Sequence, residues 1–510
     1  MPSIERDQHS ANNVSSSIAK GAAWMILLKL SERSIGFVST LVLARLLTPG
    51  DFGLVAMAMS MVALTELMSA FNFDITLIQR QNVSVDQYNT AWTYNIMFST
   101  AIGLILLLLT WPASGFYHEP RLIQLMPVLA LSSLIQGFEN VGVIAFRKEM
   151  NFRQEFRFLF SKKIVSFTVT MILAFIYHNY WALVLGTLAG KSFGVLASYY
   201  VQPYRPRLCL AASKDLFHFS KWLLINNLTL FLQTRSADFI LGRTVGPYGL
   251  GIYGISLEIS TLPSTELVAP INRAALPGYA RVSHDKQLLK REFLRVISML
   301  AMFVVPIGIG LATVADPAVR LLLGKNWLET IPLIQILAVY GTINALQSNI
   351  AQVLLALGIP KVITAIGLAS VVLILPSLYY VSSHFGAIGA AYVLITCALL
   401  ISPAVHAIFF HITGISINEY LAAVWKPLVS TAVMAATVLS FRHGLTIFYN
   451  ATPASIELIS SMLIGSITYC VILLSLWALT GKAAGPEQSI LDNILPRIAF
   501  FDPSVRNKIK

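Results

Sequence analysis

The chain has 510 residues, of which 56% are apolar and only 12% are charged, and its mean hydropathy is +0.70. Soluble globular proteins carry about 25% charged residues, and a soluble chain of this length could not bury so much apolar surface in one or two cores. The composition therefore excludes a soluble globular protein. It predicts an all-α polytopic membrane protein.

Apolar stretches long enough to cross roughly 30 Å of hydrocarbon recur along almost the whole sequence. They predict fourteen transmembrane helices. In chain order the predicted spans are 21–46, 52–71, 89–111, 122–145, 160–178, 180–201, 221–242, 250–272, 294–315, 328–356, 361–381, 386–410, 422–441 and 455–480. The connections between these spans are short, which excludes a folded domain outside the membrane.

The basic residues predict the orientation of these spans. An even number of spans puts both termini on one side, and loops rich in Lys and Arg stay in the cytoplasm. With the termini inside, the inner segments hold 26 of the 36 Lys and Arg residues, the outer loops hold five, and the spans hold five. We therefore predict that residues 1–20 and 481–510 are cytoplasmic. The net charge of +12 then reflects membrane topology rather than a nucleic-acid partner.

The sequence contains no pattern typical of a catalytic or metal centre. Its three cysteines, Cys209, Cys397 and Cys470, are widely separated and form no disulfide or zinc framework. Its nine histidines lack the spacing of metal ligands, and the sequence has no Walker A motif, nucleophile elbow or metalloprotease helix. We expect no metal, no cofactor and no enzymatic or ATP-driven reaction.

A short motif occurs twice. The segment 43–53 can be aligned with the segment 241–251 at a constant offset of 198 residues, and each copy ends one span and turns into the next. The aligned positions are Arg45 with Arg243, Pro49 with Pro247 and Gly53 with Gly251. Because six spans separate the copies, both have the same orientation. The repeat predicts two parallel six-helix lobes related by a pseudo-twofold axis along the membrane normal.

The repeat also predicts the domain organisation. The N-lobe would comprise residues 21–204 with helices one to six, and the C-lobe residues 205–412 with helices seven to twelve. Two extra helices, thirteen and fourteen, fall in 413–480 outside the repeat.

Charged residues inside spans cost about 2.5–3.5 kcal/mol each near the bilayer centre, so they usually face a cavity or a partner. The eleven in this sequence are Lys29, Glu32, Arg33, Arg45, Glu66, Glu139, Lys191, Arg235, Asp238, Glu258 and Glu266. All fall in the first eight predicted spans, and the predicted cores of the last six contain none. The sequence therefore assigns the polar function to the first eight spans.

Cations occupy comparable depths in the first span of each lobe. Lys29 and Arg33, four residues apart, share one helix face, with Glu32 beside them, and Arg235 precedes Asp238 by three. Guanidinium and ammonium groups suit phosphate oxygens, which favours a cationic cavity for an anionic headgroup. The alternative is that these groups form internal salt bridges that only lock helices together.

The remaining charges allow two interpretations as well. The lone Lys191 of the sixth span is a candidate for the cavity, whereas Arg45 reaches the interface from its span end. The carboxylates Glu66, Glu139, Glu258 and Glu266 are candidates for proton or cation coupling. Alternatively, each hydrogen-bonds a neighbouring helix.

Three segments resemble a known family. The residues 20–24 (KGAAW) and 43–56 (LARLLTPGDFGLVA) are similar to the opening of bacterial polysaccharide transporters in the multidrug/oligosaccharidyl-lipid/polysaccharide (MOP) superfamily. The residues 146–153 (FRKEMNFR) resemble the loop after the fourth span in its exopolysaccharide branch, which includes the colanic-acid-type flippase. The length, the fourteen spans and the two lobes agree with this MOP/MATE-like fold.

This resemblance implies a flippase of the bacterial inner membrane. It would move oligosaccharide repeat units linked to undecaprenyl pyrophosphate to the outer leaflet, by alternating access driven by an H⁺ or Na⁺ gradient. We assign the pyrophosphate to Lys29, Arg33 and Arg235, supported by Lys191, and the polyprenyl tail to the uncharged spans thirteen and fourteen. Membrane lipid, a polysaccharide polymerase and the export machinery are the further partners.

Three alternatives remain. A drug or cation exporter of the same superfamily would need a cavity dominated by carboxylates, which Lys29, Arg33 and Arg235 oppose. The peptidoglycan lipid II flippase has a similar architecture and differs only through the motifs quoted above. A membrane polymerase or glycosyltransferase would need a large loop or cytoplasmic domain, which this chain lacks.

Overall fold

The computed structural model describes residues 2–67, 77–78, 83–211, 221–448 and 453–481. Through this part of the chain the secondary structure is entirely helical. The predicted cytoplasmic tail lies outside the described residues, apart from Gly481. The chain divides into two compact units, Met1–Gly251 and Ile252–Lys510, which are described separately below.

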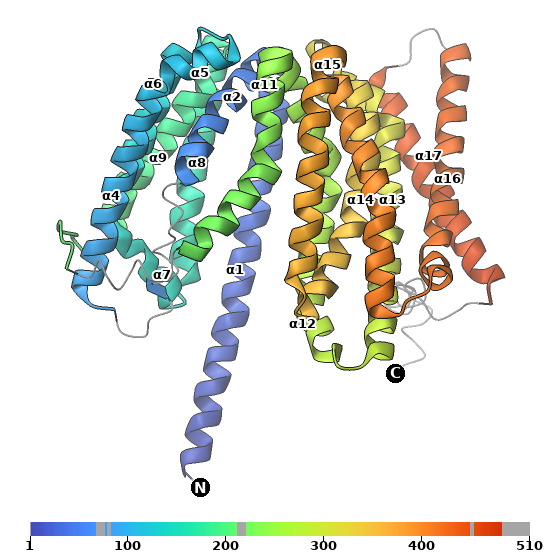
Figure 1. Ribbon diagram of the computed structural model, residues 1–510, viewed down its shortest axis with the longest axis horizontal. Helices are drawn as coiled ribbons and strands as arrows, with labels where there is room; N and C mark the ends of the chain where they lie inside the picture. The colour runs from blue at the N-terminus through green and yellow to red at the C-terminus, as the bar shows by residue number, and fades with distance from the viewer. Residues whose placement is uncertain (1, 68–76, 79–82, 212–220, 449–452, 482–510) are drawn as a thin grey trace, which may run out of the picture. The chain divides into compact units, whose positions relative to one another are not determined.

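The first unit holds the six helices of the predicted N-lobe and the first part of α11. Its elements are α1 (Pro2–Leu46), α2 (Pro49–Glu66), α4 (Val85–Leu108), α5 (Thr110–Tyr117), α6 (Leu122–Gly137), η2 (Val141–Ile144), α7 (Ala145–Lys148), α8 (Phe152–Tyr177), α9 (Trp181–Val201) and α11 (Lys221–Pro263) up to Gly251. Within this unit α8 packs along both α9 and α1, and α4 packs along α6 (Figure 1). The predicted lobe boundary near residue 204 stays a prediction.

The second unit continues from Ile252. Its further elements are the π-helical η3 (Ser264–Val268), α12 (Ala269–Val282), α13 (Lys286–Leu322), η4 (Lys325–Trp327), α14 (Thr330–Ala356), α15 (Pro360–Thr413), α16 (Ile417–Phe448) and α17 (Ala454–Leu479). Here α13 packs against α14, α16 and α17 (Figure 1).

Each of the fourteen predicted spans corresponds to a helix in the described part of the chain. The element α15 holds two spans, and α11 holds the seventh span and the start of the eighth, which continues through η3 into α12. The helix α11 is interrupted at Gly246 (φ 71°) and α15 at Gly386 (φ 63°), where glycine adopts the left-handed backbone without strain. Eight described helices are long and apolar enough to cross a membrane, or nine if the bent pair 122–137 and 141–148 counts as one span. The helices α1, α2 and α11 fall below that threshold, and charged residues interrupt each of them.

Several helices extend beyond their predicted spans. The helix α13 begins at Lys286 and ends at Leu322, outside the predicted 294–315. It starts early because the Asp285 carboxylate caps it, accepting hydrogen bonds from the backbone N–H groups of Gln287 (2.8 Å) and Leu288 (3.1 Å). The helix α16 likewise continues to Phe448, beyond the predicted end at 441. These extensions bring charged residues assigned to loops onto helices.

Small residues bring α8 and α9 close together in the first unit. A Cβ at Gly186 would overlap Thr170, and a Cβ at Gly190 would meet Ser166. One turn further, Gly194 lies against the side chain of Lys162. Spaced four residues apart, these glycines form the small-residue stripe that lets membrane helices approach closely.

The second unit has an apolar core centred on α13. Phe293, Ile297, Leu300 and Val304 recur every three or four residues on one helix face, and all four are fully buried. The Phe293 ring lies 4.7 Å, between centroids, from that of Phe409 on α15.

A buried polar cluster joins α12 to α14 within this unit. The Asn349 amide group donates to Asn272 Oδ1 (2.8 Å), and the Tyr279 hydroxyl donates to Asn349 Oδ1 (3.1 Å). Asn272 also donates to the Ser348 hydroxyl at 2.8 Å. Because these polar groups are buried and bonded to one another, they fix the mutual position of the two helices.

Candidate functional site

The charges predicted at the start of the N-lobe lie along α1. The Lys29 ammonium is 3.1 Å from Glu32 Oε2, and its side chain is nevertheless 69% exposed. Arg33, one turn further, is also exposed. Lys29 and Glu32 are therefore paired as spacing predicts, and the two cations of this helix are both exposed.

A similar pair lies on α11. Arg235 Nη1 is 3.4 Å from Asp238 Oδ2, and the Arg235 side chain is 48% exposed. Like Lys29 and Glu32, the two residues are three apart on one helix. Both pairs belong to the first unit.

A third group of charges comes from α2, α8, α9 and the segment that follows α6. Glu139, just after α6, accepts a hydrogen bond from the Lys162 ammonium of α8 at 2.7 Å. That ammonium also lies 5.0 Å from the centroid of the Phe158 ring. Lys191 of α9 is within electrostatic range of Glu66 on α2 and of Lys162. Glu139 is thus bound to a lysine near the start of the predicted span 160–178 that the sequence analysis did not single out.

The last two predicted carboxylates, Glu258 and Glu266, belong to the second unit and are exposed. Glu266 lies in the π-helical segment η3, where it accepts a hydrogen bond from the Thr265 hydroxyl at 3.0 Å. Such π-helical turns occur frequently at functional sites. The sequence analysis did not predict this turn, because no residue pattern specifies it.

The eleven predicted charges are therefore unevenly distributed. The four cations assigned to the pyrophosphate all lie in the first unit, on α1, α9 and α11. The structure brings Lys29 together with Glu32, and Arg235 together with Asp238. In each pair the two residues are three apart on the same helix.

The first copy of the repeated motif forms the start of α2. Thr48 precedes the helix, and the Asp51 carboxylate accepts hydrogen bonds from the Thr48 backbone N–H (2.9 Å) and hydroxyl (2.6 Å). Its other oxygen accepts from the Tyr180 N–H, at the start of α9, at 3.1 Å. Pro49 occupies the first helical position, where its missing N–H costs nothing.

The second copy contains the break of α11 at Gly246, immediately before Pro247. Its Arg243 donates to the carbonyl of Phe116 (2.7 Å), contacts the His118 ring and lies over the Phe116 ring. Directly after His118, the Arg121 guanidinium donates hydrogen bonds to the Glu119 carboxylate, and this lowers the pKa of Glu119 below its ordinary value. Arg45, the counterpart of Arg243, is exposed.

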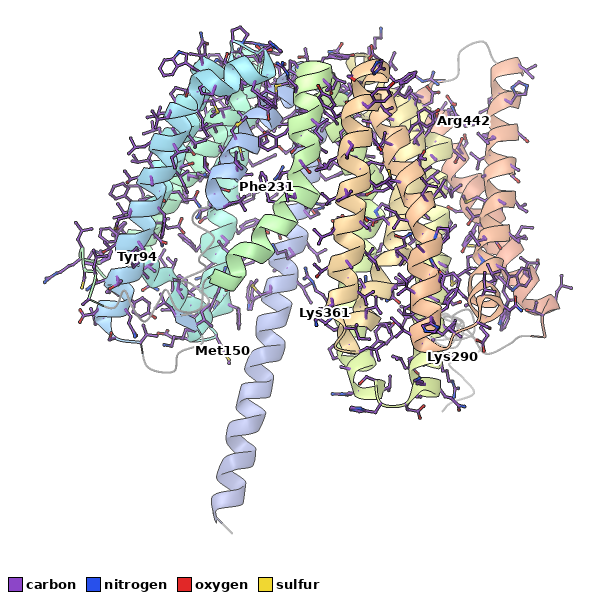
Figure 2. The ribbon with its side chains drawn as sticks, viewed as in Figure 1. Tyr94, Met150, Phe231, Lys290, Lys361 and Arg442 are labelled. Atoms are coloured by element: carbon purple, nitrogen blue, oxygen red, sulfur yellow. The ribbon has the colours of Figure 1, made fainter. Side chains whose placement is uncertain are left out.

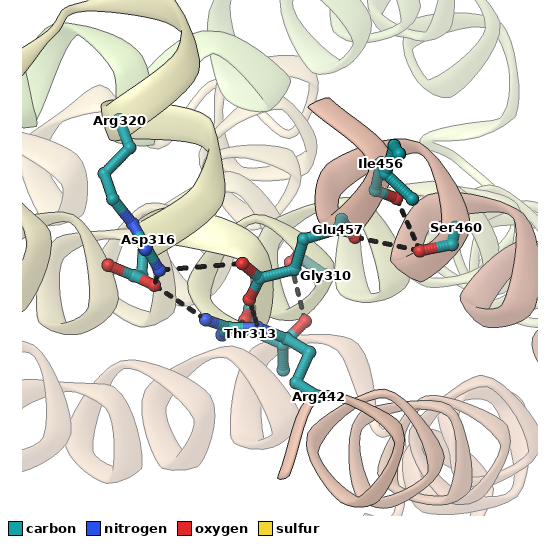
Figure 3. A network of polar contacts seen from close by, with 8 residues as sticks. All are labelled: Gly310, Thr313, Asp316, Arg320, Arg442, Ile456, Glu457 and Ser460. Atoms are coloured by element: carbon teal, nitrogen blue, oxygen red, sulfur yellow. Dashed lines mark hydrogen bonds and ion pairs between the residues drawn. The ribbon is translucent and has the colours of Figure 1, made fainter. Parts of the chain in front are cut away.

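The sequence analysis missed a charged network in the second unit, drawn in Figure 3. Arg442 of α16 donates to Glu457 Oε1 of α17 (2.8 Å), to Asp316 Oδ2 of α13 (2.9 Å) and to the carbonyl of Thr313 (2.6 Å). Arg320 pairs with both carboxylates. The Glu457 side chain is only 6% exposed. The sequence analysis places Asp316, Arg320 and Arg442 in loops, because α13 and α16 are longer than predicted. Glu457 lies at the start of the predicted span 455–480, and the sequence analysis does not include it among the charges within spans.

A second ion pair ties the other end of α16 to α13. The Lys290 ammonium is 2.6 Å from Glu419 Oε1, in the first turn of α16. Figure 2 shows Lys290 and Arg442 at opposite ends of this helix bundle. Glu419 also caps α16 through the Ser416 N–H and hydroxyl. The helices α13 and α16 are therefore joined at both ends.

Solved structures with the same fold are membrane transporters. The lipid II flippase MurJ in its inward closed conformation matches with a TM-score of 0.71 at 11% identity, covering 89% of this chain and 99% of that one. An inward-facing multidrug resistance transporter of the MATE family of the MOP superfamily matches with a TM-score of 0.53 at 13% identity, covering 76% and 96%. The predicted all-α MOP/MATE-like fold class is confirmed, and the apolar helices are those of a multi-pass membrane protein.

Sequence comparison gives the family. The family model described as polysaccharide biosynthesis protein matches residues 42–332. Relatives include the lipopolysaccharide biosynthesis protein WzxC of Escherichia coli K12, 23% identical over 437 residues (84% of this chain, 87% of the relative). The teichuronic acid biosynthesis protein TuaB of Bacillus subtilis 168 is 25% identical over 484 residues (92% and 97%). The succinoglycan biosynthesis transport protein ExoT of Rhizobium meliloti 1021 is 22% identical over 465 residues (90% and 92%). The chain belongs to the polysaccharide biosynthesis protein family.

Proposed function

We propose that the protein is a flippase that moves oligosaccharide repeat units, linked to undecaprenyl pyrophosphate, from the inner to the outer leaflet of the bacterial plasma membrane. Membership of the polysaccharide biosynthesis family supports this cargo, together with relatives named for lipopolysaccharide, teichuronic acid and succinoglycan synthesis. It acts as a transporter and not as an enzyme. The energy comes from an H⁺ or Na⁺ gradient through alternating access.

The exposure of the cations on α1 and α11 is the observation that carries the proposal. Lys29, Arg33 and Arg235 lie within predicted membrane spans and present open surface. A charge at this depth facing lipid is costly, so these side chains face water. A water-facing cationic surface inside the membrane suits a pyrophosphate, whose oxygens accept charge-assisted hydrogen bonds from ammonium and guanidinium groups.

The remaining residues take supporting roles in this proposal. Lys191 adds positive charge to the same unit, while Glu66, Glu258 and Glu266 are the candidate carboxylates for a coupling ion. The helices α16 and α17, within the predicted segment 413–480, provide an apolar surface for the polyprenyl tail. Both termini face the cytoplasm, and a polysaccharide polymerase receives the cargo on the outer side.

The drug-exporter alternative is disfavoured by the same side chains, because an organic cation would meet ammonium and guanidinium groups on α1 and α11. The likeness to the lipid II flippase rests on 11% identity and concerns the fold alone. The peptidoglycan precursor carries the same lipid pyrophosphate chemistry, so the two flippase functions are separated by the sugar and not by the charged residues.

The experiment is to delete the gene and locate the lipid-linked oligosaccharides. An impermeant sugar-binding probe on spheroplasts reports which leaflet carries them. The proposal predicts repeat units trapped in the inner leaflet and loss of polymer. Units that reach the outer leaflet but stay unpolymerised would instead indicate a polymerase, and an unchanged distribution would refute the flippase.

A further inference from the structure

The two copies of the repeated motif pack against each other reciprocally. A Cβ added at Gly53 of the first copy would overlap the backbone carbonyl of Pro247 in the second. A Cβ added at Gly251 of the second copy would overlap the carbonyl of Pro49 in the first. The residues at equivalent positions of the repeat therefore exchange the same contact in both directions. We call this contact between α2 and α11 the glycine crossing.

The glycine crossing leaves no room for a side chain on either helix. The atoms opposite each glycine are backbone atoms, which cannot rotate away as a side chain can. By contrast, a Cβ at Gly36 or Gly254 would meet nothing within 4 Å. Close backbone approach is a characteristic reason for glycine at a membrane helix interface. The close contact between the two copies therefore explains why glycine occupies positions 53 and 251 of the repeat.

The surroundings of the glycine crossing are buried and specific. The Tyr117 hydroxyl is 2.8 Å from the Ser60 hydroxyl on α2, and the Tyr117 ring stacks on Phe239 of α11 with centroids 6.3 Å apart. Met57 on α2 is fully buried, and its Cγ would lie 3.3 Å from a Cβ at Gly242 on α11. Met57 and Ser60 lie about one and two turns along α2 from Gly53, and their partners Gly242 and Phe239 precede the break of α11 at Gly246.

Both helices have a backbone break beside the crossing. The break before α2 is at Thr48, and that within α11 is at Gly246, each immediately before a proline. Positions at the ends of helical segments are where proteins absorb hinge rotations. A contact between two backbones rests on van der Waals attraction, and a gap of about 1 Å loses about half of it. The crossing therefore combines a contact that is easily broken with two adjacent hinges.

We propose that the glycine crossing is a seal at the outer ends of α2 and α11 that opens and closes in each transport cycle. Its glycines let the two backbones meet in the closed state, and rotation at Thr48 and Gly246 separates them. The inference rests on the proposed flippase function for the cycle and on the predicted topology for the outer side. Gly53 and Gly251 are positioning residues and do not touch cargo.

The test measures how fast an impermeant thiol reagent, added outside, modifies Met57→Cys in a protein whose three native cysteines are replaced by serine. Gly53→Ala and Gly251→Ala push the backbones apart, so we expect labelling faster by about fivefold or more, with slower transport. The matched controls Gly36→Ala and Gly254→Ala should label and transport as the parent does. Equal labelling of crossing and control variants would overturn the proposal.

A second measurement covers the case in which the alanine variants do not fold. In the variant Met57→Cys/Gly242→Cys, an oxidant should link α2 to α11 and stop transport, and a reductant should restore it. Each single-cysteine variant should transport with and without oxidant. Undiminished transport by the linked protein would show that this contact does not open. Labelling needs no cargo, so its outcome is independent of whether the flippase function itself is correct.

Discussion

The charged side chains on α1 and α11 of the first unit differ in their surroundings from those at the ends of α13, α16 and α17 in the second. In the first unit, charged side chains along α1 and α11 have one close partner and stay exposed, as Lys29 and Arg235 do. In the second unit, charges gather at helix ends, where Arg442, Asp316 and Glu457 are largely buried and joined to one another. The exposed fraction of the side chain therefore distinguishes the charged residues that face water from those that join helices to one another. The first kind can bind a ligand, while the second can only hold the fold.

The largest effect is expected on export, when the exposed cations of α1 are removed. Lys29→Ala and Arg33→Ala should reduce polymer export by about ten- to a hundredfold, since a hydrogen bond to a charged group contributes about 1.5–3 kcal/mol. Membrane insertion and thermal stability should not change. The control Lys361→Ala removes the same charge from an exposed position in the second unit and should export normally. Normal export by both α1 variants would contradict the assignment of the pyrophosphate to these two cations.

The locking role of the buried network predicts the next largest effect, on stability. Arg442→Ala leaves Glu457 buried without its closest cation and should lower the free energy of unfolding by about 3–5 kcal/mol. Arg320→Ala leaves Arg442 paired with both carboxylates and should cost about 1 kcal/mol or less. Thermal unfolding of the purified variants in detergent measures both. Equal losses would mean that the network does not depend on Arg442.

The uncharged polar cluster of the second unit should contribute less. Asn349→Ala removes the bonds to both Asn272 and Tyr279 and should cost about 1–3 kcal/mol, whereas Tyr279→Phe removes one bond and should cost about 1 kcal/mol. The same unfolding measurement compares them. If Asn349→Ala is no worse than Tyr279→Phe, the bond between the two asparagines contributes nothing.

The smallest effect is expected at the other end of α16. Lys290 and Glu419 are both partly exposed, and water and salt screen the attraction of exposed ion pairs. Lys290→Ala should therefore lower the unfolding temperature less than any of the variants above, and high salt should remove the difference. A loss as large as that of Arg442→Ala would show that burial does not distinguish the two locks.

The fold was predictable because apolar length alone specifies membrane helices. All fourteen spans have helices, and the motif at Pro49 and Pro247 marks two of the turns. Helix ends were not predictable to the same degree, since capping by Asp285 extends α13 toward its start and α16 continues through Arg442 to Phe448. That error concealed Asp316 and Arg442. If the predicted helices had been continued past the charged residues that follow their apolar segments, Asp316 and Arg442 would have been placed on helices.

Site geometry was the least predictable part. Spacing paired Lys29 with Glu32 and Arg235 with Asp238, because residues three apart on a helix are neighbours. The partner of Glu139 is Lys162, 23 residues away on α8, and its identity depends on how α6 packs with α8 and α9. The reciprocal contact of Gly53 and Gly251 likewise depends on packing, although the repeat had marked both residues.

The central claim is that water-facing cations of the first unit bind the pyrophosphate of the cargo. The most direct test is the Kd of the purified protein for undecaprenyl pyrophosphate, measured for the wild type and for Lys29→Ala/Arg33→Ala. The account predicts binding weaker by about tenfold or more in the double variant, with unchanged binding for Lys361→Ala. An identical Kd for the double variant and the wild type would contradict it.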